Sequence, residues 1–193
     1  TLEISAFGYF SKTVSVDIVA KEIKELSLSL EQAPTFTATF NVANSGGAPL
    51  AANLSFVDVP VEGGDTSEGS LTVDLPGGAY TVVAKSRGYQ PKTIDINVTD
   101  NQSFDLVMDS LPPYVLVDDD KGKNYETYYT AALDEAGIEY DFKNKTLSSD
   151  DLMGYANVIW FTGSASNDTL SSKEQAALKA YVNSGGRLIL TGQ

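Results

Sequence analysis

The chain has no cysteine and no histidine among its 193 residues. Without cysteine it has no disulfide scaffold, no thiol nucleophile and no thiolate zinc site. Without histidine it has no Ser-His-Asp or Cys-His machinery and no imidazole metal site. Hydrolysis by these catalytic groups is therefore excluded from this segment.

Basic residues are also scarce. The sequence has 13 lysines and arginines against 26 aspartates and glutamates, which gives a net charge of −13. Because nucleic acids and anionic membranes recruit basic patches, we expect no nucleic-acid partner. No apolar run approaches the roughly 20 residues that span a bilayer, and no signal-peptide pattern is present, so we expect no membrane insertion.

What is present is a pattern that recurs with an offset of 80 residues. Gly8-Tyr9 and the apolar alternation after it return as Gly88-Tyr89 with the same alternation. Each copy then runs into a second alternation and a proline: Leu26, Leu28, Leu30 and Pro34 in the first, Phe104, Leu106, Met108 and Pro112 in the second. A repeat of this length indicates one small module per copy. We therefore predict that residues 1–32 are the C-terminal strands of a preceding β module.

The periodicity divides the chain into a β part and an α/β part. Residues 1–31 predict three strands, at 2–7, 13–19 and 26–30, and residues 33–111 predict short strands separated by glycine-rich turns, which is typical of an antiparallel β sandwich. From 112 to 193 continuous apolar runs alternate with helical patterns, and Gly137 and Ser171 or Ser172 provide helix-end signals. The fold class that we predict is multi-domain: mainly β, followed by a parallel α/β sheet.

The middle of the chain resembles the carboxypeptidase regulatory-like domain, a transthyretin-like β sandwich. The resemblance covers residues 34–110 and depends on an ordered set of turn and strand-end motifs: Gly47-Ala48-Pro49-Leu50-Ala51-Ala52-Asn53-Leu54, Asp65-Thr66, Gly69-Ser70-Leu71, Leu75-Pro76-Gly77-Gly78-Ala79-Tyr80 and Gly88-Tyr89.

Residues 113–193 resemble the start of a flavodoxin-like, glutamine-amidotransferase-like domain. The matching segments are Val115-Leu116-Val117-Asp118-Asp119-Asp120, Tyr125 to Ile138, Val158-Ile159-Trp160-Phe161-Thr162-Gly163 and Gly185 to Gln193. The sequence stops at the fourth predicted strand, so we expect this domain to be incomplete. A class I amidotransferase needs a cysteine nucleophile and a histidine, so the resemblance does not imply that activity here.

The sharpest candidate site is Asp118-Asp119-Asp120, at the carboxyl end of the first parallel strand. Open α/β sheets bind ligands at this edge, and calcium or magnesium prefers clustered oxygen ligands. We expect no cofactor other than a calcium ion at this site. The alternative, which we favour, is that Asp119 and Asp120 form a solvated loop while Asp118 caps the next helix, because adjacent side chains point in different directions.

Two other groups of residues fit either a ligand site or a purely structural role. Thr162-Gly163-Ser164 and Thr191-Gly192-Gln193 end strands at the same predicted edge and would suit a phosphate or carbonyl ligand, although small residues also serve tight turns. Tyr125, Tyr128 and Tyr129 with Trp160 would suit a carbohydrate platform, but their helical spacing favours core packing.

The two resemblances together are similar to the C-terminal accessory regions of secreted subtilisin-like peptidases. They imply a non-catalytic accessory segment of a larger secreted or cell-surface bacterial peptidase, serving as spacer, stabiliser or binding module. Its partners would be the catalytic and other domains of the parent chain, with a protein or carbohydrate as ligand. The alternative is a surface adhesin or carbohydrate-binding array, which an exposed row of aromatic residues on the sandwich would favour.

Overall fold

The computed structural model describes residues 1–144, 147–164, 167 and 169–192. The chain divides into two compact units, of which the first comprises Thr1–Ala43, Pro49–Ala84 and Thr93–Leu106. The second comprises Asn44–Ala48, Lys85–Lys92 and Val107–Gln193. Mainly β structure with a parallel α/β sheet is present, as the sequence predicts at this coarse level.

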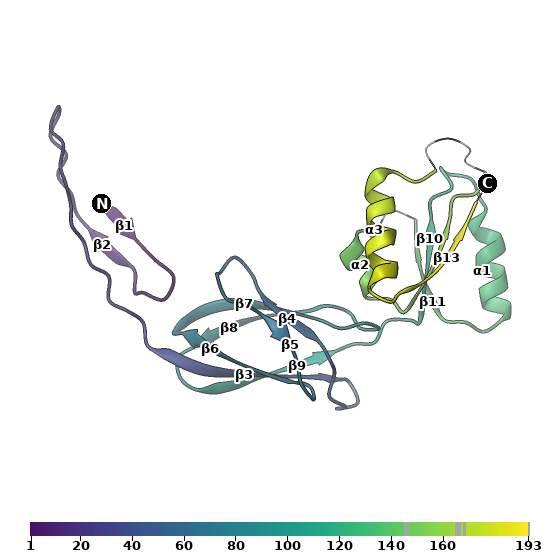
Figure 1. Ribbon diagram of the computed structural model, residues 1–193, viewed down its shortest axis with the longest axis horizontal. Helices are drawn as coiled ribbons and strands as arrows, with labels where there is room; N and C mark the ends of the chain where they lie inside the picture. Colours follow the sequence, from purple (N-terminus) through teal and green to yellow (C-terminus); the bar gives the residue numbers. More distant parts are fainter. Residues whose placement is uncertain (145–146, 165–166, 168, 193) are drawn as a thin grey trace. The chain divides into compact units, whose positions relative to one another are not determined.

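Seven strands between residues 35 and 108, which are labelled in Figure 1, form two sheets with the strand orders β6-β3-β9 and β5-β4-β7-β8. Their bounds are β3 Thr35–Asn44, β4 Asn53–Phe56, β5 Gly64–Asp65, β6 Ser70–Pro76, β7 Gly78–Lys85, β8 Lys92–Val98 and β9 Gln102–Met108. Strands β3 and β6 pair antiparallel, as do β4 and β5. Phe40 of one sheet meets Phe56 of the other edge to face, with the ring centroids 5.8 Å apart. The two sheets therefore enclose one core, as in a β sandwich.

The N-terminal region contains less strand than the sequence predicts. Strands β1 (Leu2–Ile4) and β2 (Lys12–Val14) form an antiparallel pair, but residues 26–30 form no strand. The prediction of a third strand there is wrong, because alternation alone does not make a strand. The backbone N–H and C=O groups also need a neighbouring strand with which to pair.

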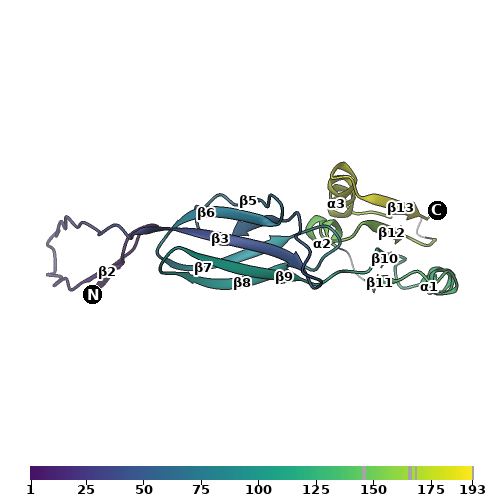
Figure 2. The ribbon, with the colours of Figure 1, turned by 90° about the horizontal axis from the view of Figure 1, so that it is seen from below.

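Residues 114–191 form a parallel sheet with the strand order β11-β10-β12-β13 (Figure 2). The elements are β10 Tyr114–Asp118, α1 Glu126–Glu135, β11 Tyr140–Lys143, α2 Ser149–Met153, β12 Asn157–Phe161, α3 Ser172–Asn183 and β13 Arg187–Thr191. Helix α1 covers one face of this sheet, and α2 and α3 cover the other (Figure 1). Val115, Leu116 and Val117 of β10 are fully buried, since β10 is a central strand covered on both faces.

Of the two serines that the sequence offers as the N-cap of α3, the structure uses Ser171, and Gly137 follows α1 as predicted. Ser171 caps α3, where its hydroxyl accepts a hydrogen bond from Glu174 N and the Glu174 side chain accepts one from Ser171 N. Ser148 and Asp151 form the same reciprocal arrangement at the start of α2. Gly137 follows α1 with φ +63°, a conformation that glycine adopts without strain. These caps fix where each helix begins or ends beside the sheet.

Candidate functional site

Acidic side chains gather where β10 ends and α1 begins. Asp118 is the last residue of β10, Asp119 and Asp120 follow it, and Glu126 is the first residue of α1. The carboxyl ends of parallel strands meet at one edge of the sheet, which is where open α/β sheets bind ligands.

Three of these residues converge. One carboxylate oxygen from each of Asp118, Asp120 and Glu126 lies within 4.8 Å of the other two. Asp118 is only 6% exposed and Asp120 only 2%. Two oxygens on opposite sides of a calcium ion, each about 2.4 Å from it, are about 4.8 Å apart. The spacing therefore suits a hard divalent cation. We call Asp118, Asp120 and Glu126 the acid cluster.

Asp120 organises the loop between β10 and α1. Its Oδ1 accepts hydrogen bonds from Gly122 N (3.0 Å) and Lys123 N (2.8 Å), and its Oδ2 accepts one from Tyr125 N (3.2 Å). The favoured alternative of a solvated loop is therefore wrong for Asp120, which is buried. Asp118 does not cap the helix either, since the N-cap residue of α1 is Tyr125 and has no side-chain cap hydrogen bond.

Asp119 points away from the acid cluster. Its Oδ2 accepts a hydrogen bond from Trp160 Nε1 (3.3 Å), and its Oδ1 lies 3.5 Å from Lys121 Nζ. The predicted set of three consecutive aspartates therefore does not come together. The structure places Asp118 and Asp120, two residues apart, together with Glu126 from the helix.

Glu126 contributes a buried oxygen that lacks a partner. Its Oε2 is inaccessible to solvent and has no hydrogen-bond donor among the described residues. Burying a carboxylate oxygen without a partner is costly, and buried polar atoms in native proteins are nearly always paired. A cation held between the three carboxylates would supply the missing partner.

The electrostatics of the cluster are unfavourable without a counter-charge. Burial raises the pKa of Asp118 above its ordinary value, and the charges of Asp120 and Glu126 raise it further, although the hydrogen bond from Asp120 N lowers it. Like charges this close disfavour ionisation, whereas a bound cation would favour it.

The small strand-end residues pack against one another. Thr162 is buried, its N donates to Thr191 O (2.9 Å), and a Cβ on Gly192 would lie 2.0 Å from Thr162 Oγ1. Gly163 has φ +59°, and a Cβ there would lie 2.7 Å from the ring of Tyr125. These contacts show close packing at Thr162, Gly163 and Gly192. Ser164 is exposed, and Gln193 lies outside the described residues.

A shallow hollow of about 350 Å³ opens beside these strand ends, and its lining is Tyr125, Tyr128, Tyr129, Gly163, Ser164, Thr191 and Gly192. Tyr129 stacks on Phe161 with the ring centroids 4.4 Å apart, whereas Tyr128 is 73% exposed. Trp160 is fully buried. Trp160 therefore has the expected core role and is unable to contribute to a carbohydrate platform. Tyr128 does not have that core role, because most of its surface is exposed.

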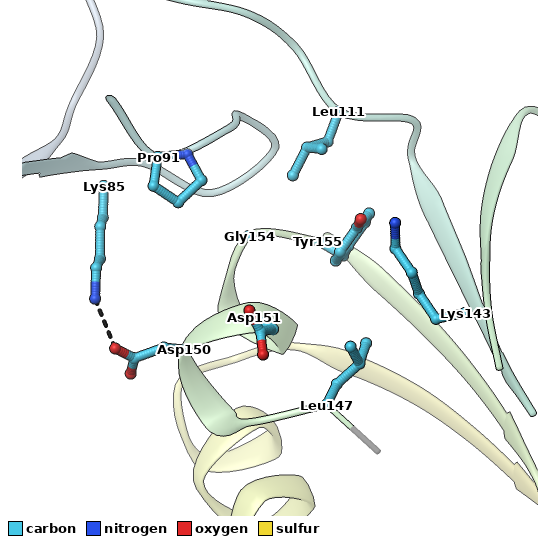
Figure 3. Close-up of a pocket in the computed structure, with 9 residues that line it drawn as sticks. All are labelled: Lys85, Pro91, Leu111, Lys143, Leu147, Asp150, Asp151, Gly154 and Tyr155. Carbon is cyan, nitrogen blue, oxygen red and sulfur yellow. Dashed lines mark hydrogen bonds and ion pairs between the residues drawn. The ribbon is translucent and has the colours of Figure 1, made fainter. Parts of the chain in front are cut away.

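A second hollow of about 410 Å³ lies in the same unit (Figure 3). Its lining is Lys85, Pro91, Leu111, Lys143, Leu147, Asp150, Asp151, Gly154 and Tyr155. Lys85 Nζ pairs with Asp150 Oδ2 at 2.6 Å, and Tyr155 Oη donates to Asp141 Oδ2. Burial, then this contact with Asp141, raises the pKa of the Tyr155 phenol. Lys143 Nζ lies 3.7 Å from Asp141 Oδ2, and Asp151 accepts a hydrogen bond from Ser148 N, so the charged groups of this hollow have partners within the chain.

No family model matches the chain, and a search of curated proteins finds no significant match. Among solved structures, the Bacillus anthracis TIE protein has a TM-score of 0.35 and 16% identity, over 46% of this chain and 19% of that one. A type II cohesin–X-dockerin complex from Acetivibrio cellulolyticus has a TM-score of 0.34 and 18% identity, over 40% and 59%. A DUF3823 family protein from Parabacteroides merdae has a TM-score of 0.32 and 12% identity, over 42% and 49%.

The chain spans less than two thirds of the length of each of these three structures. In the described part of the chain, no helix has both the length and the hydropathy that crossing a bilayer requires. The chemistry of the acid cluster is thus the most specific functional feature that the residues provide.

Proposed function

We propose that this chain is a non-catalytic accessory segment of a larger secreted bacterial peptidase. We also propose that a divalent cation, with calcium as the first choice, stabilises its α/β unit (residues 114–191). The lack of histidine and cysteine supports the absence of catalysis. The strand order β11-β10-β12-β13 is the second, first, third and fourth strand in chain order, as at the start of flavodoxin-like sheets. The resemblance to accessory regions of subtilisin-like peptidases supports the assignment of the parent protein.

The observation that carries the cation proposal is the convergence of the acid cluster around a buried oxygen of Glu126 that has no partner. Asp120 is held in place by three backbone N–H groups, so its carboxylate is pre-organised before an ion binds. Calcium accepts six to eight oxygen ligands in flexible geometry, so water and nearby carbonyl groups are able to complete the shell.

The adhesin alternative has less support. The aromatic residues on the strands of the two-sheet module (β3 to β9) are buried or half-buried; they are Phe36, Phe40, Phe56, Tyr80 and Phe104. The exposed row of aromatic residues that would favour a carbohydrate-binding array is not found on the seven strands of this module.

The catalytic part of the proposal is tested with common substrates. The purified chain should not hydrolyse casein or glutamine, because it has no histidine or cysteine with which to activate a nucleophile. Turnover that disappears on the single change Asp118→Asn would overturn the accessory assignment and indicate carboxylate or metal-assisted catalysis.

The cation part is tested by thermal unfolding with calcium and with a chelator. A ligand that binds only the folded state adds RT ln(1 + [L]/Kd) to the free energy of unfolding, about 2.7 kcal/mol at a hundredfold excess over Kd. We expect calcium to raise the Tm of the parent chain and not that of Glu126→Gln. An equal rise in both proteins would show that calcium binds elsewhere.

A further inference from the structure

Residues 1–33 end in a defined backbone junction. Tyr9 forms an antiparallel bridge with Gln32, and Ala33 N donates to Gly8 O at 2.9 Å. Gly8 has φ +79°, so the turn before Tyr9 uses a conformation that glycine favours. These contacts hold the backbone of Gln32 and Ala33 beside Gly8 and Tyr9, directly before Pro34.

The same junction occurs a second time, 80 residues later for its glycine and tyrosine and 78 residues later for the residues that pair with them. Tyr89 forms an antiparallel bridge with Ser110, and Leu111 N donates to Gly88 O at 2.8 Å. Gly88 has φ +86°, and Pro112 follows directly. Because the bridge, the hydrogen bond and the glycine conformation all recur, residues 1–33 and 81–111 have corresponding positions in two copies of one module.

Corresponding apolar residues differ strongly in exposure. In residues 81–111 these side chains fill the core of the two-sheet module, whereas in residues 1–33 they face solvent. The pairs are Leu2 (44% exposed) with Val82 (0%), Ile18 (89%) with Val98 (1%), and Leu28 (38%) with Leu106 (0%). The first copy thus has the sequence pattern of a buried face without the strands that bury it.

The complete copy shows which strands are required. Its core residues Val82, Val98 and Leu106 lie on β7, β8 and β9. Strand β3 lies between β6 and β9, and β4 lies between β5 and β7. Strands β7 and β8 belong to one sheet and β9 to the other. The strands that complete both sheets around these core residues, β3 to β6, therefore come from the segment of residues 34–80.

We propose that the apolar face of residues 1–33 is an interaction surface for a polypeptide segment with the strand pattern of β3 to β6, located N-terminal to Thr1. That segment completes a second β sandwich, and residues 26–30 then pair as the counterpart of β9. The role proposed for this face is independent of the acid cluster and is additional to the proposed function.

The test is to extend the chain by a duplicate of its own residues 34–80 directly before Thr1. By the offset of the repeat, Tyr80 of the duplicate then precedes Thr1 as Tyr80 precedes Thr81 in the complete copy. We expect the amides of residues 26–30 to exchange at least about tenfold more slowly in the extended chain than in the parent chain. We also expect the extended chain to bind less of a hydrophobic dye per molecule.

Leu28→Asp and Ser29→Asp are a matched pair of variants. The counterpart of Leu28 is the buried Leu106, and the counterpart of Ser29 is Val107, which is 49% exposed. In the extended chain Leu28→Asp should remove the slowed exchange and Ser29→Asp should leave it, whereas neither change should matter in the parent chain. The proposal is overturned if the extension brings no slowing, or if both variants behave alike. It is also overturned if the parent chain is a dimer whose residues 26–30 are already protected, since a second copy would then be the occupant.

Discussion

Replacing Trp160 by alanine is expected to lower the free energy of unfolding of the α/β unit by about 3–5 kcal/mol, the usual cost of deleting a large buried aromatic side chain. Trp160 lies on the central strand β12 and is fully buried in a cluster with Val117, Leu152 and Tyr181. The substitution also removes the hydrogen bond from its Nε1 to Asp119. Urea unfolding followed by circular dichroism measures the effect, because Trp160 is the one tryptophan and fluorescence would lose its probe.

Tyr128→Ala is the matched control for this variant. Tyr128 is also aromatic and belongs to the same unit, but 73% of it is exposed. We expect its replacement to change the free energy of unfolding by no more than about 0.5 kcal/mol. A cost below about 1 kcal/mol for Trp160→Ala would contradict the placement of this side chain in the core.

Two neighbouring aspartates are expected to affect stability in opposite directions when no cation is present. Asp120→Ala removes a buried acceptor of three backbone hydrogen bonds and should destabilise the α/β unit by about 2–4 kcal/mol. Asp120→Asn should cost less, because the remaining carbonyl oxygen is still able to accept from Gly122 N and Lys123 N. Chemical unfolding in the presence of a chelator measures both changes.

Asp118→Asn should instead stabilise the cation-free protein at neutral pH. Because burial raises the folded-state pKa of Asp118, its contribution to stability is present below its unfolded pKa of about 3.8 and is lost as the pH rises through the folded-state pKa. The variant should escape that loss, so its advantage over the parent chain grows across this pH window. Equal stability of the two proteins from pH 3 to pH 7 would show that Asp118 is not desolvated in the folded state.

The α/β elements were predictable because their signals are local. The run from Tyr114 to Val117 is too short for a helix and suits a buried strand. Ser171 and Ser172 both fit a capping pattern that depends on neighbouring residues alone, and the structure selects Ser171. The third N-terminal strand was not predictable in the same way, because Leu26, Leu28 and Leu30 require a partner that the alternation does not specify.

The acid cluster was only partly predictable. Asp118 and Asp120 are two residues apart, and side chains at that spacing on an extended backbone share one side, so the sequence does contain the signal that separates them from Asp119. Glu126 has no such signal, since an acidic residue in the first turn of a helix is common for electrostatic reasons. Its approach to the aspartates depends on the loop that Asp120 holds by its three hydrogen bonds.

Calorimetric titration of calcium into the chelator-treated chain tests the account most directly. We predict saturable binding of a single ion to the parent chain and to Asp119→Asn, whose side chain points toward Trp160 and away from the acid cluster. The double variant Asp118→Asn and Glu126→Gln should bind no calcium, because two of the three converging carboxylates are lost. No saturable heat for the parent chain at millimolar calcium, or unchanged binding by the double variant, would contradict a cation site in the acid cluster.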